Sequence, residues 1–273
     1  MTPSGLADVV TLVRAVARTV VMPRFRKLAV GDVSTKSGPM DLVTIADEEA
    51  EIRLGAGLTR LFPGCAVVGE EAATRDPTIL KVIRDAPLCF IVDPIDGTYN
   101  FASGLPLFGV MVAVVEHGQT TAAVIHDPIG DDTATALAGQ GAWMEAADGS
   151  RVALHVASPV SVAAMAGTVS WRYMAEPLRG RVCSRLPLLG AAWDFRCAAH
   201  QYRLMAAGHC HYSVYNRLLP WDHAAGVLLH QEAGGHSARL DGSPYDPADP
   251  EGGIICTPDP ASWTALRAAL FDA

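Results

Sequence analysis

The sequence has no surplus of basic residues. Of its 273 residues, 21 are Lys or Arg and 29 are Asp or Glu, which gives a formal net charge of -8. Proteins that bind the phosphate backbone of nucleic acids normally concentrate positive charge on one face. We therefore expect neither DNA nor RNA as a partner.

The sequence also lacks a cysteine framework. It contains no C-x-x-C pair and no spacing typical of a zinc finger. We therefore expect buried or incidental thiols in a reducing compartment. The six cysteines are Cys65, Cys89, Cys183, Cys197, Cys210 and Cys256.

Long apolar runs are missing as well. The richest, Leu105 to Val115, is broken by Pro106 and Gly109, so it is typical of a core strand rather than a membrane span. Asp8 and Arg14 interrupt the apolar residues at the N-terminus, which does not resemble a signal peptide. We expect a cytoplasmic protein with no membrane partner.

Hydrophobic residues make up 50% of the chain and charged residues 18%, as in an ordinary globular enzyme. Their spacing predicts a mixture of helices and mainly antiparallel strands, with no repeats and no long linker. We interpret residues 1–273 as a single catalytic domain with halves of about 1–150 and 151–273. Helices are expected at 5–22, 45–61, 77–85, 192–207, 221–233 and 259–271, and strands at 66–68, 88–92, 107–115, 120–126, 133–138, 162–170, 209–215 and 254–256.

Three segments place acidic residues directly after an apolar run. They are Gly69-Glu70-Glu71, Asp93-Pro94-Ile95-Asp96-Gly97-Thr98 and Trp221-Asp222. Carboxylates that converge on one cleft repel one another unless cations lie between them. Magnesium prefers oxygen ligands and leaves positions open for phosphate and water. The pattern therefore predicts a magnesium site for transfer of a phosphoryl group to water.

Each motif also has a simpler interpretation. Asp, Pro and Gly are common turn residues, so the segment from Asp93 to Thr98 is also typical of a structural turn. Glu70 is compatible with a solvated acidic turn, and Asp222 with a helix N-cap. The three motifs in this order favour the functional interpretation. A haloacid dehalogenase-like phosphatase is an alternative, but its two aspartates are two residues apart, whereas Asp93 and Asp96 are three apart.

The combination resembles the inositol monophosphatase family over nearly the whole chain. Four segments carry the resemblance: Lys36-Ser37-Gly38-Pro39-Met40-Asp41-Leu42-Val43-Thr44 with Asp47; Gly69-Glu70-Glu71; Asp93-Pro94-Ile95-Asp96-Gly97-Thr98; and Trp221-Asp222-His223-Ala224-Ala225-Gly226 with Glu232-Ala233-Gly234-Gly235. The resemblance implies an α+β fold in a layered αβαβα sandwich, two or three Mg²⁺ ions, lithium sensitivity and a homodimer.

The resemblance also implies roles for individual residues. One metal is expected on Glu70, Asp93 and the carbonyl of Ile95, and a second on Asp93, Asp96 and Asp222. Thr98, Asp47 and Glu70 are the expected catalytic residues that position and activate the attacking water. The amides of Gly97 and Thr98 are expected to receive the phosphate. Lys36 and Asp41 are expected on a mobile loop near the site.

Two departures from the family pattern lie on the leaving-group side, where Asp96, Ala192 and Tyr215 are expected to contact the substrate. Tyr215 stands where inositol phosphatases typically carry a glutamate, seven residues before Asp222. Gly190-Ala191-Ala192 stands where a Gly-Ser/Thr-Ala segment is typical. A site loses selectivity when a group that binds a substrate hydroxyl disappears.

The resemblance implies hydrolysis of inositol monophosphate or a similar polyol or sugar phosphate by direct attack of a metal-activated water. Related activities on 3′-phosphoadenosine nucleotides, fructose 1,6-bisphosphate or histidinol phosphate stay open. An alternative of another class is a non-catalytic regulatory protein that binds metal or phosphate.

Overall fold

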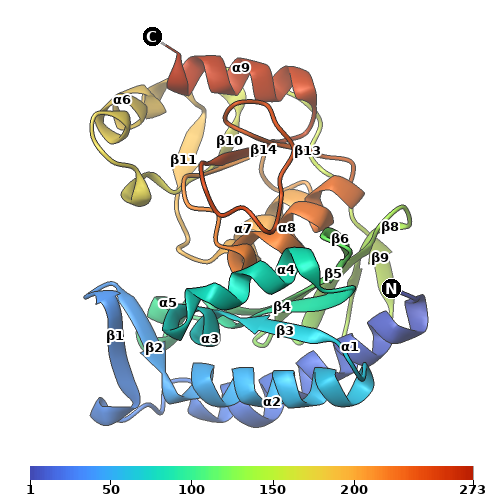
Figure 1. Ribbon diagram of the computed structural model, residues 1–273. Coiled ribbons are helices and arrows are strands. Elements are labelled where there is room, and N and C mark those ends of the chain that lie inside the picture. The colour runs from blue at the N-terminus through green and yellow to red at the C-terminus, as the bar shows by residue number, and fades with distance from the viewer. Residues whose placement is uncertain (273) are drawn as a thin grey trace.

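The computed structural model describes residues 1–272 as five alternating layers of helices and sheets (Figure 1). The helices are α1 (Pro3–Val16), α2 (Ile45–Leu61), α3 (Glu70–Arg75), α4 (Val82–Asp85), α5 (Thr98–Ala102), α6 (Leu178–Arg185), α7 (Ala198–Ala206), α8 (Pro220–Glu232) and α9 (Pro260–Phe271). The strands are β1 (Val33–Gly38), β2 (Asp41–Thr44), β3 (Ala66–Gly69), β4 (Leu88–Asp96), β5 (Gly109–Glu116), β6 (Gln119–Asp127), β7 (Asp132–Leu137), β8 (Gly141–Glu145), β9 (Arg151–Ala153), β10 (Ala166–Val169), β11 (Ala191–Trp193), β12 (Tyr212–Tyr215), β13 (His236–Arg239) and β14 (Ile254–Thr257).

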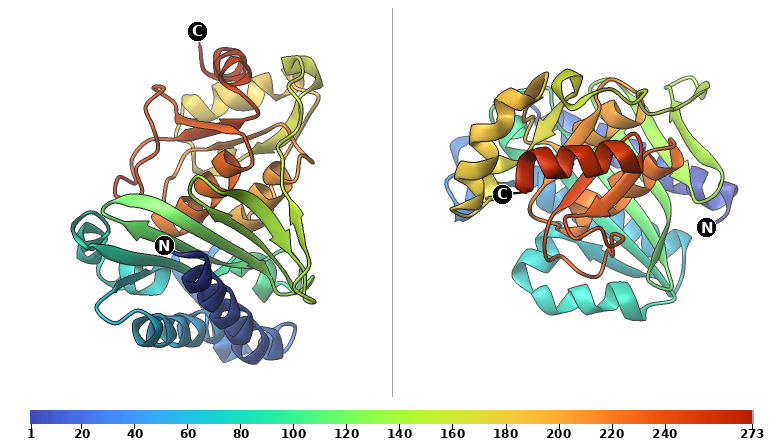
Figure 2. Two further views of the ribbon diagram at one scale, coloured as in Figure 1. Left: turned by 90° about the vertical axis from the view of Figure 1, so that its right-hand side faces the viewer. Right: turned by 90° about the horizontal axis from the view of Figure 1, so that it is seen from above.

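The larger sheet has seven strands in the order β3-β4-β5-β6-β7-β8-β9. Its strands are antiparallel except for the parallel pair β3 and β4. Because side chains alternate between the faces of a strand, Phe90 and Val92 pack against α1 and α2, while Cys89 and Ile91 pack toward α7 and α8. The sheet is thus covered by helices on both faces (Figure 2).

The smaller sheet has the order β11-β10-β12-β14-β13 and mixes parallel and antiparallel pairs. A hydrophobic cluster that includes Val182 and Leu266 packs α6 and α9 onto its outer face. Helices α7 and α8 lie between the two sheets (Figure 1). This arrangement confirms the expected layered αβαβα sandwich of the α+β class.

Most expected elements are present, with shifted ends. The expected helix over 5–22 begins as α1 and continues in short turns of other helical types to Arg24. The expected helix over 192–207 is wrong in its first turn, because Ala191, Ala192 and Trp193 pair with β10 as the edge strand β11. The expected loop that carries Lys36 and Asp41 is a β-hairpin of β1 and β2.

All six cysteines are free thiols, as expected. Within residues 1–272, no helix combines the length and the apolar character that crossing a membrane requires.

Candidate active site

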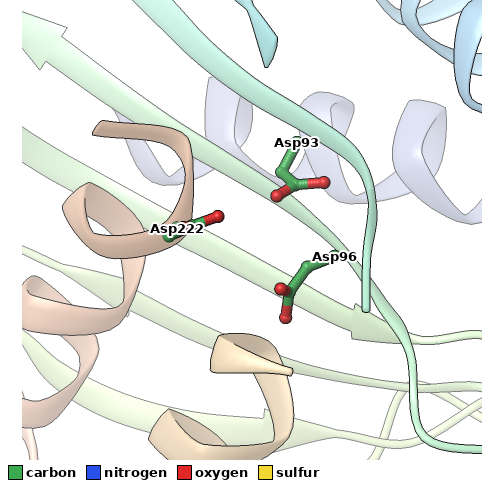
Figure 3. A group of neighbouring side chains, drawn as sticks. All are labelled: Asp93, Asp96 and Asp222. Carbon is green, nitrogen blue, oxygen red and sulfur yellow. The ribbon is translucent and has the colours of Figure 1, made fainter. Parts of the chain in front are cut away.

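Three aspartates from two separate elements meet at one point between the two sheets (Figure 3). Asp93 and Asp96 lie at the end of β4, and Asp222 lies in the first turn of α8. The pairing of β4 with β5 is irregular between Asp93 and Asp96. One carboxylate oxygen from each aspartate lies within 4.8 Å of those of the other two.

The electrostatics of this cluster favour a bound cation. Burial raises the pKa of Asp93 well above its ordinary value, and the neighbouring Glu70, Asp96 and Asp222 raise it further. Burial and Asp222 likewise raise the pKa of Asp96 to about 7. Buried carboxylates that repel one another in this way are the donor set that hard divalent cations such as Mg²⁺ prefer. The residues therefore fit the expected metal.

Glu70 lines the same pocket but its carboxylate is engaged with a lysine. The parallel register of β3 and β4 pairs Gly69 with Val92, which brings Glu70 beside Asp93. Lys36 Nζ donates to Glu70 Oε1 at 2.8 Å and to Glu71 Oε1 at 2.6 Å. Burial raises the pKa of Glu70 to about 8, with Lys36 opposing this rise and Glu71 and Asp222 adding to it.

Glu51 of α2 holds the start of α3, next to Glu70, and no motif in the sequence marks it. Its carboxylate accepts the amide protons of Glu71 and Ala72 at 2.7 and 2.9 Å. These bonds satisfy free donors at the start of α3. Glu51 lies twenty residues before Glu71, so only the fold reveals the contact.

Asp47 and Thr98 form a hydrogen-bonded pair at the side of the cluster. Asp47 closes the capping box of α2, because its Oδ2 accepts the Thr44 amide at 2.9 Å and the Thr44 hydroxyl at 2.6 Å. Thr98 Oγ1 lies 3.0 Å from both Asp47 Oδ1 and the Ile95 carbonyl oxygen. Burial raises the pKa of Asp47 to about 7, with Thr44 and Thr98 opposing the rise. The single hydroxyl proton of Thr98 can serve only one acceptor at a time.

Gly97 joins β4 to α5 in a conformation that favours glycine. Its φ is +87°, and a Cβ atom there would lie 2.9 Å from the Leu107 carbonyl oxygen and 3.2 Å from Cys197 Cβ. The turn places the Thr98 amide at the start of α5, where helix amides have no intrahelical acceptor. Such a turn can receive phosphate oxygens.

Asp96 is held from the second half of the chain. Cys197 Sγ lies 3.0 Å from Asp96 Oδ2, and the Ala199 amide donates to the same oxygen at 2.5 Å. Cys197 is buried and immediately precedes α7. The sequence offered no signal for this role, because a single cysteine outside any motif carries none.

The expected substrate contacts divide between two places. Tyr215 lines the pocket from β12, and its ring stacks on Tyr202 at a centroid distance of 5.3 Å. The expectation for Ala192 is wrong, because Ala192 is exposed on the edge strand β11 and does not line this pocket. Ala198 lines it instead. The Gly190-Ala191-Ala192 segment resembles the family motif in residue types but not in position. It forms strand β11, and the chain enters the pocket only after this strand.

The expected loop residues Lys36 and Asp41 lie on the β1–β2 hairpin. Met40, Asp41 and Leu42 line the pocket, so the hairpin forms part of its wall. Residues on the remaining wall were not anticipated: Ser170, Tyr173, Asp194, Arg196, Gln201, Asn216 and Arg217.

Comparisons with known proteins place the chain among proteins of one family. Residues 5–273 match the model of the inositol monophosphatase family. An inositol-1-monophosphatase of Bacillus subtilis is 31% identical over 216 residues, which cover 78% of each chain. A fructose-1,6-bisphosphatase/inositol-1-monophosphatase of Thermotoga maritima is 30% identical over 213 residues, which cover 78% of this chain and 77% of that one.

A solved structure, the extragenic suppressor protein suhB of Bartonella henselae, has a similar fold. Its TM-score is 0.80 at 27% identity, over 99% of both chains.

Proposed function

Because the chain belongs to the inositol monophosphatase family, we propose that it is a magnesium-dependent phosphatase that hydrolyses a small phosphate monoester. The substrate class we favour is inositol monophosphate or a similar polyol or sugar phosphate. The observation that carries the proposal is the meeting of Asp93, Asp96 and Asp222 within 4.8 Å in a pocket that Glu70 also lines.

Five groups hold the metal ions in this proposal. Glu70, Asp93 and the Ile95 carbonyl hold one Mg²⁺ ion, and Asp93, Asp96 and Asp222 hold another. Bound there, the ions supply Lewis acidity and a water of lowered pKa. Neutralising charge also removes the repulsion that raises the pKa of Asp93. Of the two Glu70 carboxylate oxygens, Lys36 Nζ contacts only Oε1, so Oε2 is available to the ion while the two positive charges share one carboxylate.

Thr98 and Asp47 orient the attacking water. The Thr98 hydroxyl faces Asp47 Oδ1 at 3.0 Å, so it can accept a hydrogen bond from the water while it donates to the carboxylate. Asp47, with its pKa raised to about 7, can accept a proton near neutral pH. Glu70 assists in activating the same water.

The amides of Gly97 and Thr98 receive the phosphate oxygens, and their rigid turn fixes the phosphorus in line for attack. The leaving alcohol of the substrate lies toward Tyr215. Asp96 lies between the part of the pocket that holds the metal and the part that holds the alcohol. Tyr215 is neutral, so it offers no carboxylate to a sugar-like hydroxyl. The proposal leaves room for nucleotide, fructose bisphosphate or histidinol phosphate as the substrate, and it includes a homodimer in the cytoplasm that lithium inhibits.

The test is release of inorganic phosphate from a panel of inositol, sugar, nucleotide and histidinol phosphates, with and without magnesium. Turnover that requires magnesium and is abolished in Asp93→Asn supports the proposal. An Asp85→Asn variant is the matched control, because Asp85 is an exposed carboxylate outside the pocket. Absence of turnover on every substrate would favour the non-catalytic binding alternative. A phospho-aspartate trapped at Asp93 would exclude direct attack by water.

A further inference from the structure

The β1–β2 hairpin forms one wall of the pocket but is weakly anchored to the body of the protein. In the described chain, residues 33–43 contribute no side chain to the three hydrophobic clusters. The pairing of its two strands is irregular between Thr35 and Gly38. The hairpin extends beyond the main sheet at one end of the molecule (Figure 1). Individual side-chain contacts therefore decide where it lies relative to the site.

One of these contacts competes with the proposed metal. Lys36 reaches Glu70 and Glu71 from β1, and its side chain is only 8% exposed. Glu70 is also a proposed ligand of Mg²⁺. A cation bound at Glu70 weakens the attraction between Glu70 and Lys36, because both positive charges use one carboxylate. The hairpin therefore loses part of this tether when the site is loaded.

Arg196 provides a second tether that uses no carboxylate. Its guanidinium carbon lies 3.6 Å from the centroid of the Tyr99 ring, a close cation–π contact. Its Nη2 donates to the Met40 carbonyl oxygen at 3.3 Å. Tyr99 belongs to α5, next to the proposed phosphate-binding turn, and Met40 lies at the tip of the hairpin. The arginine thus connects the hairpin to the turn across the pocket.

The backbone of Arg196 is strained, so the chain holds this arginine in place at a cost in stability. Its φ is +54°, a region that favours glycine. The Asp194 carboxylate holds the conformation, because its Oδ1 accepts the Arg196 amide at 2.8 Å and Gln201 Nε2 at 3.1 Å. Glycine would adopt this conformation freely but would remove the contact to Met40 of the hairpin and the contact to Tyr99 of α5.

We propose that Arg196 is a positioning residue that holds the β1–β2 hairpin closed over the phosphate-binding turn. Its contacts do not depend on Glu70, so they persist when cations occupy the carboxylate cluster. The hairpin then covers the pocket with Met40, Asp41 and Leu42 while Glu70 is free to bind metal. The effect on turnover rests on the proposed phosphatase function, whereas the effect on the hairpin does not.

The chain offers a direct test because it has three lysines, Lys27, Lys36 and Lys81. Lys27 and Lys81 are exposed, whereas the Lys36 side chain is buried against α3. Cleavage of the full-length protein by a lysine-specific protease therefore reports opening of the hairpin at Lys36, with two internal standards. In Arg196→Gly with saturating magnesium, cleavage after Lys36 should be about tenfold faster, since a stacking contact and a hydrogen bond are lost. Cleavage at the other two lysines should not change.

A melting measurement and two further variants separate this role from a general loss of stability. Arg196→Gly should melt close to the wild-type temperature, because relief of the backbone strain offsets the loss of the two contacts. Tyr99→Phe keeps the ring under the guanidinium and should behave as wild type. Arg172→Gln is the matched control, because Arg172 stacks on Tyr173, another tyrosine of the pocket, at 5.8 Å.

The kinetic measurement is kcat/KM, which should fall by up to about tenfold in Arg196→Gly and stay unchanged in Arg172→Gln. Unchanged cleavage at Lys36 in a folded Arg196→Gly variant overturns the proposal, as does an equal increase in Arg172→Gln. If the wild type releases no phosphate from any substrate, the phosphatase function fails and the cleavage result still decides the role of Arg196.

Discussion

Replacing Asp93 with asparagine should stabilise the metal-free protein while removing its response to magnesium. Asp93 is buried, and its carboxylate oxygens approach those of Asp96 and Asp222 within 4.8 Å. Its Oδ1 accepts the Ile95 amide at 3.1 Å, a bond that the side-chain oxygen of asparagine can keep. The substitution therefore removes charge with little change of shape.

The size of the effect follows from Coulomb's law. At an effective dielectric constant of about 20, two ionised carboxylates at this separation repel by about 3.5 kcal/mol. Protonation relieves part of this repulsion in the wild type, so we expect a net gain of about 2–3 kcal/mol at alkaline pH. For a chain of this size, that gain raises the melting temperature by about 4–12 °C.

The gain should grow with pH. The pKa values of Asp96 and Glu70 are raised to about 7 and about 8 in the folded protein. The metal-free folded chain therefore keeps protons that the unfolded chain has released, in the window between about pH 4 and pH 8. In that window each such proton makes wild-type stability fall by up to about 1.4 kcal/mol per pH unit as the pH rises.

The assay is thermal unfolding with a chelator and with saturating magnesium, at about pH 5 and about pH 8.5. Magnesium should stabilise the wild type strongly at the higher pH and Asp93→Asn hardly at all. Asp85→Asn, which changes an exposed carboxylate, should follow the wild type throughout. A metal-free Asp93→Asn protein that is less stable than the wild type at alkaline pH would refute the reasoning, as would a full response to magnesium.

Three other predictions concern the pocket. Thr98→Ala should lower kcat by at least about a hundredfold, whereas kcat of Thr98→Ser should stay within about tenfold of the wild type, because only serine keeps a hydroxyl for the water. Equal losses of kcat in the two variants in steady-state assays would contradict this role. Gly97→Ala should destabilise the fold more than Gly149→Ala in denaturant melts, because both residues have positive φ but only at Gly97 does a Cβ meet other atoms. The magnesium concentration that gives half-maximal activity should fall as the pH rises from about 6 to about 8, because Asp96 and Glu70 must lose protons to bind the cation; no dependence on pH would argue that these carboxylates are not ligands.

Local patterns in the sequence predicted the elements that carry the carboxylates. The expected helix over 45–61 is α2, and Thr44 and Asp47, three residues apart, form both hydrogen bonds of a capping box at its start. The apolar run that ends at Asp93 is β4, and Trp221-Asp222 opens α8. Each of these signals depends on residues a few positions apart, which is the range over which a sequence pattern is informative.

Contacts that depend on distant segments could not be predicted in this way. Alanine favours helices, yet Ala191 and Ala192 form a strand because β10 offers them a free edge. The strands of the β1–β2 hairpin are mostly half-buried, and their side chains show no alternation of apolar and polar residues. Cys197 contacts Asp96 across 101 positions of the chain, and no local pattern marks it.

The order of strands in the larger sheet has a consequence for folding kinetics. From β4 to β9 each strand pairs with its successor in the chain, so this part of the sheet can assemble through contacts that are short in sequence. Asp93 and Asp96 are in place once it forms, but Asp222 arrives only when α8 docks from the second half. A cation that bridges these residues therefore stabilises a state that is reached late. Magnesium should slow unfolding more than it accelerates folding. The magnesium-bound protein should therefore be long-lived because it unfolds slowly.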